Sequence, residues 1–283
     1  MNREQPGPPF PSPLLALGVS LAAMLLYMAI ATAAEGNAFG VALASALAFG
    51  GIGTLVARFV PEPAPVRIGL TPFPVRAALP VLLLVPAVLL SSELDNWIRL
   101  ALDAKSPEGL GKAIVPAAEI ALLMIFLQPT VEEFFFRGVL LQGCVSGLGR
   151  LRGVLLLALL QALLFARGDL ATPAGAASAI AQTFALAVLL GFVRLATGSV
   201  LPAIALSCTM QAAGLVGLAY PNQLAIPGFN APGATTPVVF LLPATASVAL
   251  GVWLLSQQLA REPALPPIPP RSAEDDEESG PLF

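Results

Sequence analysis

The sequence predicts an all-α, polytopic membrane protein with about eight transmembrane helices. Hydrophobic residues fill 57% of the 283 positions and charged residues only 11%, with a mean hydropathy of +0.83; soluble domains hold about 25% charged residues. Several continuous apolar stretches reach the roughly 20 residues that a helix needs to cross a bilayer. A transmembrane barrel would instead show short alternating segments, so we set the barrel aside.

The apolar stretches define the expected spans in chain order. They are residues 14–34, 39–57, 75–91, 114–134, 151–168, 175–194, 199–219 and 237–257. Short segments that hold Pro, Gly and most of the charge separate them, as is typical of loops between membrane helices. The first stretch is longer than the roughly 7–15 residues of a signal-peptide core, so we expect it to be a span.

The chain divides into a transmembrane domain, residues 14–260, and two tails. Residues 1–13 are Pro-rich, and residues 261–283 are Pro-rich and then acidic. Both tails are too poor in apolar residues to form a core, so we expect disorder. With the N-terminus inside, nine Lys or Arg residues fall in cytoplasmic segments and four in outer loops. This bias predicts a multi-pass protein of the cell membrane with both termini in the cytoplasm.

One loop has a helical pattern of its own. The stretch "ELDNWIRLALDAK", residues 93–105, is amphipathic and carries Trp97. We expect it to be a surface helix that lies along the membrane interface.

Composition excludes several classes of function. The chain has no basic stripe with interleaved aromatic residues, so we expect no nucleic-acid partner. Its two cysteines, Cys144 and Cys208, lie in or beside apolar segments and form no disulfide framework. The sequence contains no histidine, which excludes imidazole metal ligands and every Ser/His or Cys/His nucleophilic arrangement. We expect no metal and no cofactor.

Three charges interrupt the apolar stretch "PTVEEFFFRGVLLQ", residues 129–142. Glu133 and Arg137 are four residues apart on a helix and therefore face each other. Glu132 lies about 100° around the helix, and a carboxylate among apolar neighbours in a bilayer is normally kept for a site. The alternative is that all three mark a helix end, with Arg137 reaching the lipid headgroups.

A second charged cluster, "FARGD", ends with Asp169. If the chain turns near residues 150–152, Glu132 and Asp169 both lie about 26 Å from the turn and are level. Alternatively, Arg167 and Asp169 only end the fifth span at the outer interface. The first reading places Asp169 beside Glu132.

Ser207 and Gln211 are polar residues inside the seventh span. They are four residues apart and share a helix face, with Cys208 and Thr209 turned away. Small and polar residues also serve helix packing in membranes. Their expected depths from the turn near Gly198, about 13 and 20 Å, do not match the 26 Å of Glu132.

Together these segments resemble the CPBP family, the CAAX-prenyl-protease-like and bacteriocin-immunity-associated intramembrane endopeptidases. "EEFFFR" resembles the EExxxR motif, "FARGD" falls where the family has FxxxH, and "GSVLPAIALSCTMQ" where it has Gly-Ser followed by HxxxN or HxxxD. The resemblance covers the motif core, residues 116–219.

The resemblance implies a membrane-embedded peptide hydrolase. Glu132 would activate water, Glu133 and Arg137 would order the site, and the histidines and the asparagine would stabilise the oxyanion. This chain has Asp169, Ser207 and Gln211 at those three positions. Ser207 and Gln211 can still donate hydrogen bonds, but neither carries a proton near neutral pH.

Three hypotheses stay open. The chain is a degenerate protease that keeps a cavity for a membrane-embedded or lipidated polypeptide; or an active hydrolase in which Glu132 and Asp169 share a proton; or a membrane transporter or scaffold whose charges mark a path or a helix contact. The missing histidines favour the first. They also predict an inactive or strongly altered enzyme.

Overall fold

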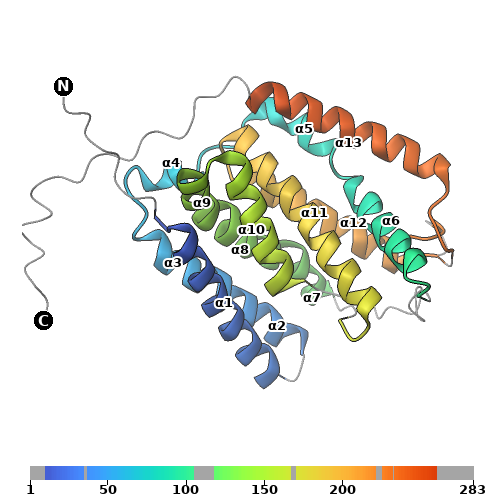
Figure 1. The fold of residues 1–283 in the computed structure, drawn as a ribbon, viewed down its shortest axis with the longest axis horizontal. Coiled ribbons are helices and arrows are strands. Elements are labelled where there is room, and N and C mark those ends of the chain that lie inside the picture. Colours follow the sequence, from blue (N-terminus) through green and yellow to red (C-terminus); the bar gives the residue numbers. More distant parts are fainter. Residues whose placement is uncertain are drawn as a thin grey trace, which may run out of the picture.

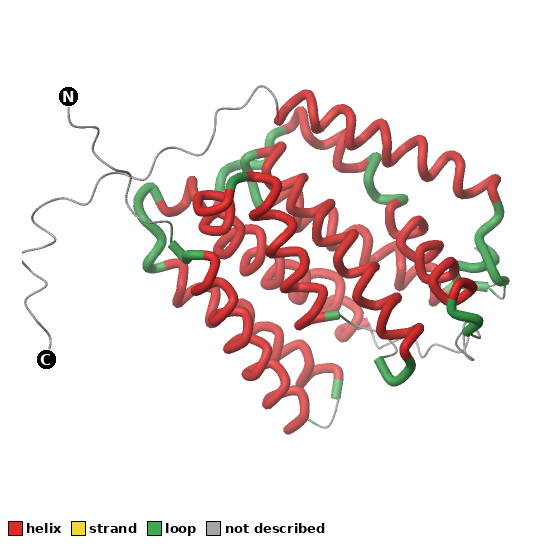
Figure 2. Tube along the Cα trace, viewed as in Figure 1, coloured by secondary structure: helices red, strands yellow, loops and turns green. Residues whose placement is uncertain are grey.

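The computed structural model describes residues 10–34, 37–104, 118–166, 170–220, 225–231 and 233–259. Nearly all of these residues are helical, and their only β structure is an isolated bridge between Pro227 and Ala231. Figures 1 and 2 show the helices side by side in one bundle, with the loops at its ends. The all-α prediction is confirmed.

The helices follow one another with few interruptions. The α-helices are α1 (Pro13–Ala33), α2 (Ala38–Ser45), α3 (Ile52–Ala57), α4 (Ala64–Ile68), α5 (Ala78–Leu82), α6 (Ala87–Ala101), α7 (Ala118–Leu122), α8 (Gln128–Glu133), α9 (Leu141–Leu148), α10 (Arg150–Phe165), α11 (Pro173–Thr197), α12 (Leu201–Ala219) and α13 (Val238–Leu259). A 3-10 turn, Val75–Ala77, precedes α5, and π-helical segments (Ala46–Gly51, Leu123–Leu127 and Phe134–Leu140) join α2 to α3 and α7 through α9.

Five helical runs in the described residues are long and apolar enough to cross a membrane. They are Pro13–Ala33, Phe39–Ala57, Val75–Ala101, Pro173–Thr197 and Val238–Leu259. The other three predicted spans are helical too: they correspond to the run from α7 to α9, to α10 and to the shorter apolar helix α12. The chain is a polytopic membrane protein.

Local signals explain where α11 begins and ends. The Thr172 hydroxyl accepts a hydrogen bond from the Gly175 amide, and Pro173 occupies the first helical position, where no amide proton is needed. Gly198 ends the helix in the left-handed conformation, with φ of 68°. The turn at Gly198 leads directly into α12.

Two apolar clusters hold the bundle together. The first centres on Phe49, Phe135 and Phe136. It joins the helical run from α7 to α9 to helices α1, α3 and α10. The second joins α5, α6, α11, α12 and α13 around Leu84, Leu206 and other buried residues. The first cluster contains two of the three phenylalanines in "EEFFFR", so the motif is part of a core.

The prediction that residues 93–105 form a surface helix along the membrane interface is wrong. Residues 93–101 continue α6, and Glu93, Asn96 and Arg99 are 3%, 7% and 8% exposed, whereas Trp97 is 59% exposed. The polar face is turned into the protein and the apolar face outward. In a bilayer this arrangement is stable because lipid, not water, covers the outer face, and the buried polar groups bond to one another.

The tails lie largely outside the described residues, which include neither residues 1–9 nor 260–283. Residues 10–12, at the end of the predicted N-terminal tail, contact the bundle. The Gln142 side chain donates a hydrogen bond to the Phe10 carbonyl, the Phe10 ring lies 6.0 Å from that of Phe59, and Ser12 caps α1.

Candidate functional site

Glu133 and Arg137 form a buried ion pair at the junction of α8 and the following π-helical segment. Arg137 Nε lies 3.2 Å from Glu133 Oε2, and Nη1 lies 3.4 Å from Oε1. Both residues are 2% exposed. The predicted pairing is present, and its burial excludes the alternative in which Arg137 reaches the headgroups.

Arg137 also ties the motif to α11. Its Nη2 donates a hydrogen bond of 3.0 Å to the backbone carbonyl of Ala187, and its Cζ lies 5.8 Å from the centre of the Phe136 ring. A guanidinium in an apolar interior is costly unless its donors are used. The carboxylate and the carbonyl of a second helix use them here, so this pair holds two helices in register.

The phenylalanines of the motif pack inward. The Phe136 ring is 4.9 Å from that of Phe135 and 5.4 Å from that of Phe165, and Phe49 contacts all three at 5.1–5.9 Å. Such tilted and edge-to-face pairs stabilise a core beyond the area they bury. Phe165 is the last residue of α10, so the cluster fixes the end of α10 against the motif.

Glu132 is distinguished from Glu133 by its exposure. Its side chain is only partly buried, whereas Glu133 is enclosed. This difference agrees with the prediction that Glu132 does not share the environment of the Glu133–Arg137 pair. The π-helical segment that starts directly after Glu133 also departs from regular helix geometry, and such departures are frequent at functional sites.

Asp169 and Arg167 lie outside the described residues, between the end of α10 at Phe165 and Leu170. The Phe136–Phe165 contact brings the end of α10 to the motif. The expected proximity of Asp169 and Glu132 stays a prediction.

The Gly-Ser entry of the third segment is a structural turn. Ser199 is fully buried; its hydroxyl donates to the Thr71 carbonyl at 2.8 Å and accepts from the Leu201 amide at 3.2 Å. The Val200 amide donates to the Gly69 carbonyl at 2.8 Å. These bonds hold the start of α12 against the chain that follows α4.

Ser207 and Gln211 lie on α12, which packs against α8. Ser207 is partly buried and Gln211 is exposed. On α12, Cys208 lies beside Thr130 of α8 and near Glu133. The sequence pattern placed Cys208 on the helix face away from Ser207 and Gln211. The polar residue that could have indicated this neighbour is Thr130, two residues before Glu132.

The described residues contain no group of three His, Cys, Asp or Glu side chains that could hold a metal ion. Among these residues, two adjacent carboxylates differ in exposure, and one of them, Glu133, is paired with Arg137. The site offers Glu132 as a proton acceptor, and hydroxyl, thiol and amide groups as hydrogen-bond partners.

Comparison with known families identifies this part of the chain. Residues 115–213 match the family model described as Type II CAAX prenyl endopeptidase Rce1-like. The match spans the three motif segments and confirms the resemblance. No curated protein and no solved structure matches the chain significantly.

Proposed function

We propose that this membrane protein, whose residues 115–213 carry an Rce1-like CAAX endopeptidase domain, is a degenerate protease that binds polypeptide segments in the bilayer without hydrolysing them. One observation carries the proposal. All 283 residues together contain no histidine, while the buried Glu133–Arg137 pair of the motif is kept.

The chemistry of peptide hydrolysis explains why this combination matters. A water molecule needs a positioned base, the leaving amine needs a proton, and the oxyanion needs preorganised donors. Glu132 is a candidate base, but the Ser207 hydroxyl cannot replace a histidine as a general acid or base near neutral pH. Gln211 is exposed and does not replace a fixed donor. The scaffold of the site and the candidate base are retained, whereas the histidines are not.

The retained contacts support a binding role for the domain. A buried ion pair is not needed for stability as such, because apolar residues of similar volume often serve equally well. In this chain the pair also bonds to the Ala187 carbonyl of α11. It therefore preserves the position of α11 relative to the helical run that carries Glu132, as a retained binding site requires.

The apolar surroundings of Glu132 indicate the chemistry of the bound polypeptide, which we call the client. The helices beside Glu132 are apolar, with Leu122 and Phe126 exposed on the same run, so a client must be stable in hydrocarbon. A transmembrane segment or a lipidated polypeptide meets this requirement. We place the protein in the cell membrane with both termini in the cytoplasm, as the charge bias indicates.

Binding and cleavage are measured on the same sample. The protein is reconstituted in nanodiscs with a fluorescent peptide that contains a membrane segment, with and without a farnesyl group. We expect an anisotropy change that shows binding, and an intact peptide by mass spectrometry. A Glu132→Gln variant should bind equally well.

Three results would replace the proposal. Cleavage that both Glu132→Gln and Asp169→Asn abolish would support the active acid pair. Solute flux in proteoliposomes that depends on Glu132 would support a transporter. Absence of binding and of both activities would leave a scaffold.

A further inference from the structure

Arginines gather at one end of the helical bundle, which we call the basic end. It is formed by the segment between α3 and α5, residues 58–77, and by the turns that join α9 to α10 and α11 to α12 (Figure 1). Residues 58–77, 148–152 and 194–201 contain six arginines but one acidic residue, Glu62, whose carboxylate accepts a hydrogen bond from the Ala64 amide at 3.0 Å. The arginines are Arg58, Arg67, Arg76, Arg150, Arg152 and Arg194.

Two of these arginines are buried and fix the segment 58–77 to the bundle. Arg67 and Arg194 are 1% and 3% exposed, and Arg194 Nη2 donates a hydrogen bond of 2.9 Å to the Arg67 carbonyl. At the end of the segment, Gln258 of α13 donates to the Arg76 carbonyl at 3.3 Å. The segment thus extends from α3, past the end of α11, to the C-terminal end of α13.

The other four arginines of the basic end are exposed. The start of the segment 58–77 lies near α9, because α3 packs against the π-helical segment that leads into α9. The α9–α10 turn follows directly. The exposed residues are Arg58 and Arg76 on the segment 58–77, and Arg150 and Arg152 at the start of α10.

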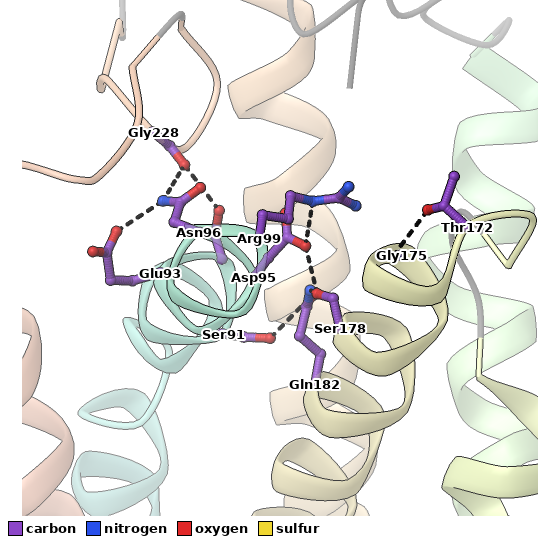
Figure 3. A network of polar contacts seen from close by, with 11 residues as sticks. Ser91, Glu93, Asp95, Asn96, Arg99, Thr172, Gly175, Ser178, Gln182 and Gly228 are labelled. Carbon is purple, nitrogen blue, oxygen red and sulfur yellow. Dashed lines mark hydrogen bonds and ion pairs between the residues drawn. The ribbon is translucent and has the colours of Figure 1, made fainter. Parts of the chain in front are cut away.

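Charge is balanced on the last turns of α6, towards the opposite end of the bundle. Arg99 Nε lies 2.7 Å from Asp95 Oδ1, and Asp95 also accepts a hydrogen bond from the Ser178 hydroxyl of α11 (Figure 3). The basic residue there has an acid of its own helix as its partner. The three segments of the basic end hold no acidic residue apart from Glu62, so this end has an excess of positive charge.

The most acidic part of the chain follows α13, which ends at the basic end. Residues 274–278, "EDDEE", begin 15 residues after Leu259, the last residue of α13, and a stretch with five prolines joins them to it. A proline-rich chain rises about 3.1 Å per residue, so 15 residues reach about 46 Å. α11 packs against both α13 and α10. Because packed helices lie about 8–10 Å apart, the acidic run reaches the start of α10.

We propose that Arg58, Arg76, Arg150 and Arg152 form a docking site for residues 274–278 of the same chain. Charge complementarity and reach carry the inference. Carboxylates and guanidinium groups form charge-assisted and frequently bidentate hydrogen bonds. The tether gives the acidic run an effective concentration of about a millimolar, which offsets the weakness of single ion pairs at a surface. The contact depends on several arginines together and weakens as salt is added.

The docked run covers a segment that packs on the motif. Ile68 of α4 is 4% exposed, and a Cβ added at Gly138, the residue after Arg137, would lie 3.1 Å from Ile68 Cγ2. Docking therefore adds contacts to the segment that closes the basic end beside the motif. This surface is separate from the site of the proposed function, and the inference does not depend on that function.

Cysteine cross-linking in the full chain tests the docking. The background carries Cys144→Ala and Cys208→Ala, and the protein is reconstituted in nanodiscs of phosphatidylcholine. The reporter pair is Ser146→Cys, at an exposed position of α9, and Ser279→Cys, directly after the acidic run. Copper phenanthroline should form this disulfide about fivefold faster or more than that of a Leu102→Cys/Ser279→Cys pair, because Leu102 follows α6 at the opposite end.

Charge changes show whether the arginines hold the acidic run. Arg150→Gln with Arg152→Gln should lower the cross-linking rate of the reporter pair about threefold or more, as should about 0.5 M NaCl. The matched control is Lys105→Gln with Lys112→Gln, which changes the net charge equally in the connection between α6 and α7. It should cross-link at the parental rate.

Three outcomes overturn the inference. Equal rates for the two cysteine pairs show that the run is not docked. A parental rate in a monodisperse Arg150→Gln/Arg152→Gln protein, or an equal loss in the lysine control, shows that these arginines do not hold it. In nanodiscs with phosphatidylglycerol, the reporter pair should stay within about twofold of its rate in phosphatidylcholine; a fall to the rate of the arginine variant identifies lipid headgroups as the occupant.

Discussion

Arg137 bridges Glu133 and the Ala187 carbonyl: its Nε lies 3.2 Å from the carboxylate and its Nη2 3.0 Å from the carbonyl of α11. The charges of Glu133 and Arg137 therefore pair with each other, and Arg137 joins their helix to α11. Glu132, next to them, is only partly buried; in the proposed function it is the carboxylate nearest the bound polypeptide.

Removal of the guanidinium should destabilise the protein strongly. Arg137→Met leaves the Glu133 carboxylate buried without its partner, which typically costs about 3–5 kcal/mol. The measurement is the free energy of unfolding in detergent, followed by circular dichroism. The control is the double variant Glu133→Gln/Arg137→Met, which should recover a large part of the loss. A double variant as unstable as Arg137→Met would contradict this account of the pair.

Truncation of the central aromatic residue should have a comparable effect. Phe136 is 1% exposed and contacts the rings of Phe49, Phe135 and Phe165, so Phe136→Ala should cost about 3–5 kcal/mol. Phe126→Ala is the matched control, because Phe126 is 55% exposed on the same helical run and should change stability little. Equal losses in the two variants would show that the aromatic cluster is not a core.

The two cysteines should differ in reactivity. Cys144 is fully buried in the first apolar cluster, whereas Cys208 is partly exposed beside Thr130. A small methanethiosulfonate reagent should label the folded protein at one site, and Cys208→Ser should abolish the labelling. A client peptide that occupies the site should slow it. Labelling of Cys144 at the same rate would contradict the placement of these helices.

The turn between α9 and α10 should not tolerate a side chain. Gly149 has φ of 83° and ψ of 168°, a conformation that is essentially restricted to glycine. Gly149→Ala should lower the free energy of unfolding by about 1 kcal/mol or more. Gly51→Ala, at a helical glycine with nothing within 4 Å of the added Cβ, should be neutral or stabilising. The same denaturation measurement compares the two.

The sequence predicted the helices and the Glu133–Arg137 pair because both depend on local information. An apolar stretch of sufficient length is helical in a bilayer whatever its neighbours are. Two residues four apart on a helix meet without any tertiary contact. The family resemblance from "EEFFFR" to "GSVLPAIALSCTMQ" was predictable for the same reason, since residue types and their order carry it.

The contacts between helices were not predictable. The amphipathic pattern of residues 93–101 shows that α6 has a polar face but not whether that face meets water or other helices. The rotation of α12 that brings Cys208 to Thr130 is set by packing against α8, α6 and α11. The rotation of a helix about its axis and its depth in the membrane depend on many side chains at once. Residue spacing along one helix does not predict either of them.

The measurement that tests the central claim most directly is peptide cleavage by the purified protein. Reconstituted protein is incubated with membrane-segment peptides, with and without a farnesyl group, and the products are analysed by mass spectrometry beside a Glu132→Gln sample. The account predicts intact peptide in both samples and retained binding. Cleavage by the native chain that disappears in Glu132→Gln would show an active protease that works without histidine and would contradict the account.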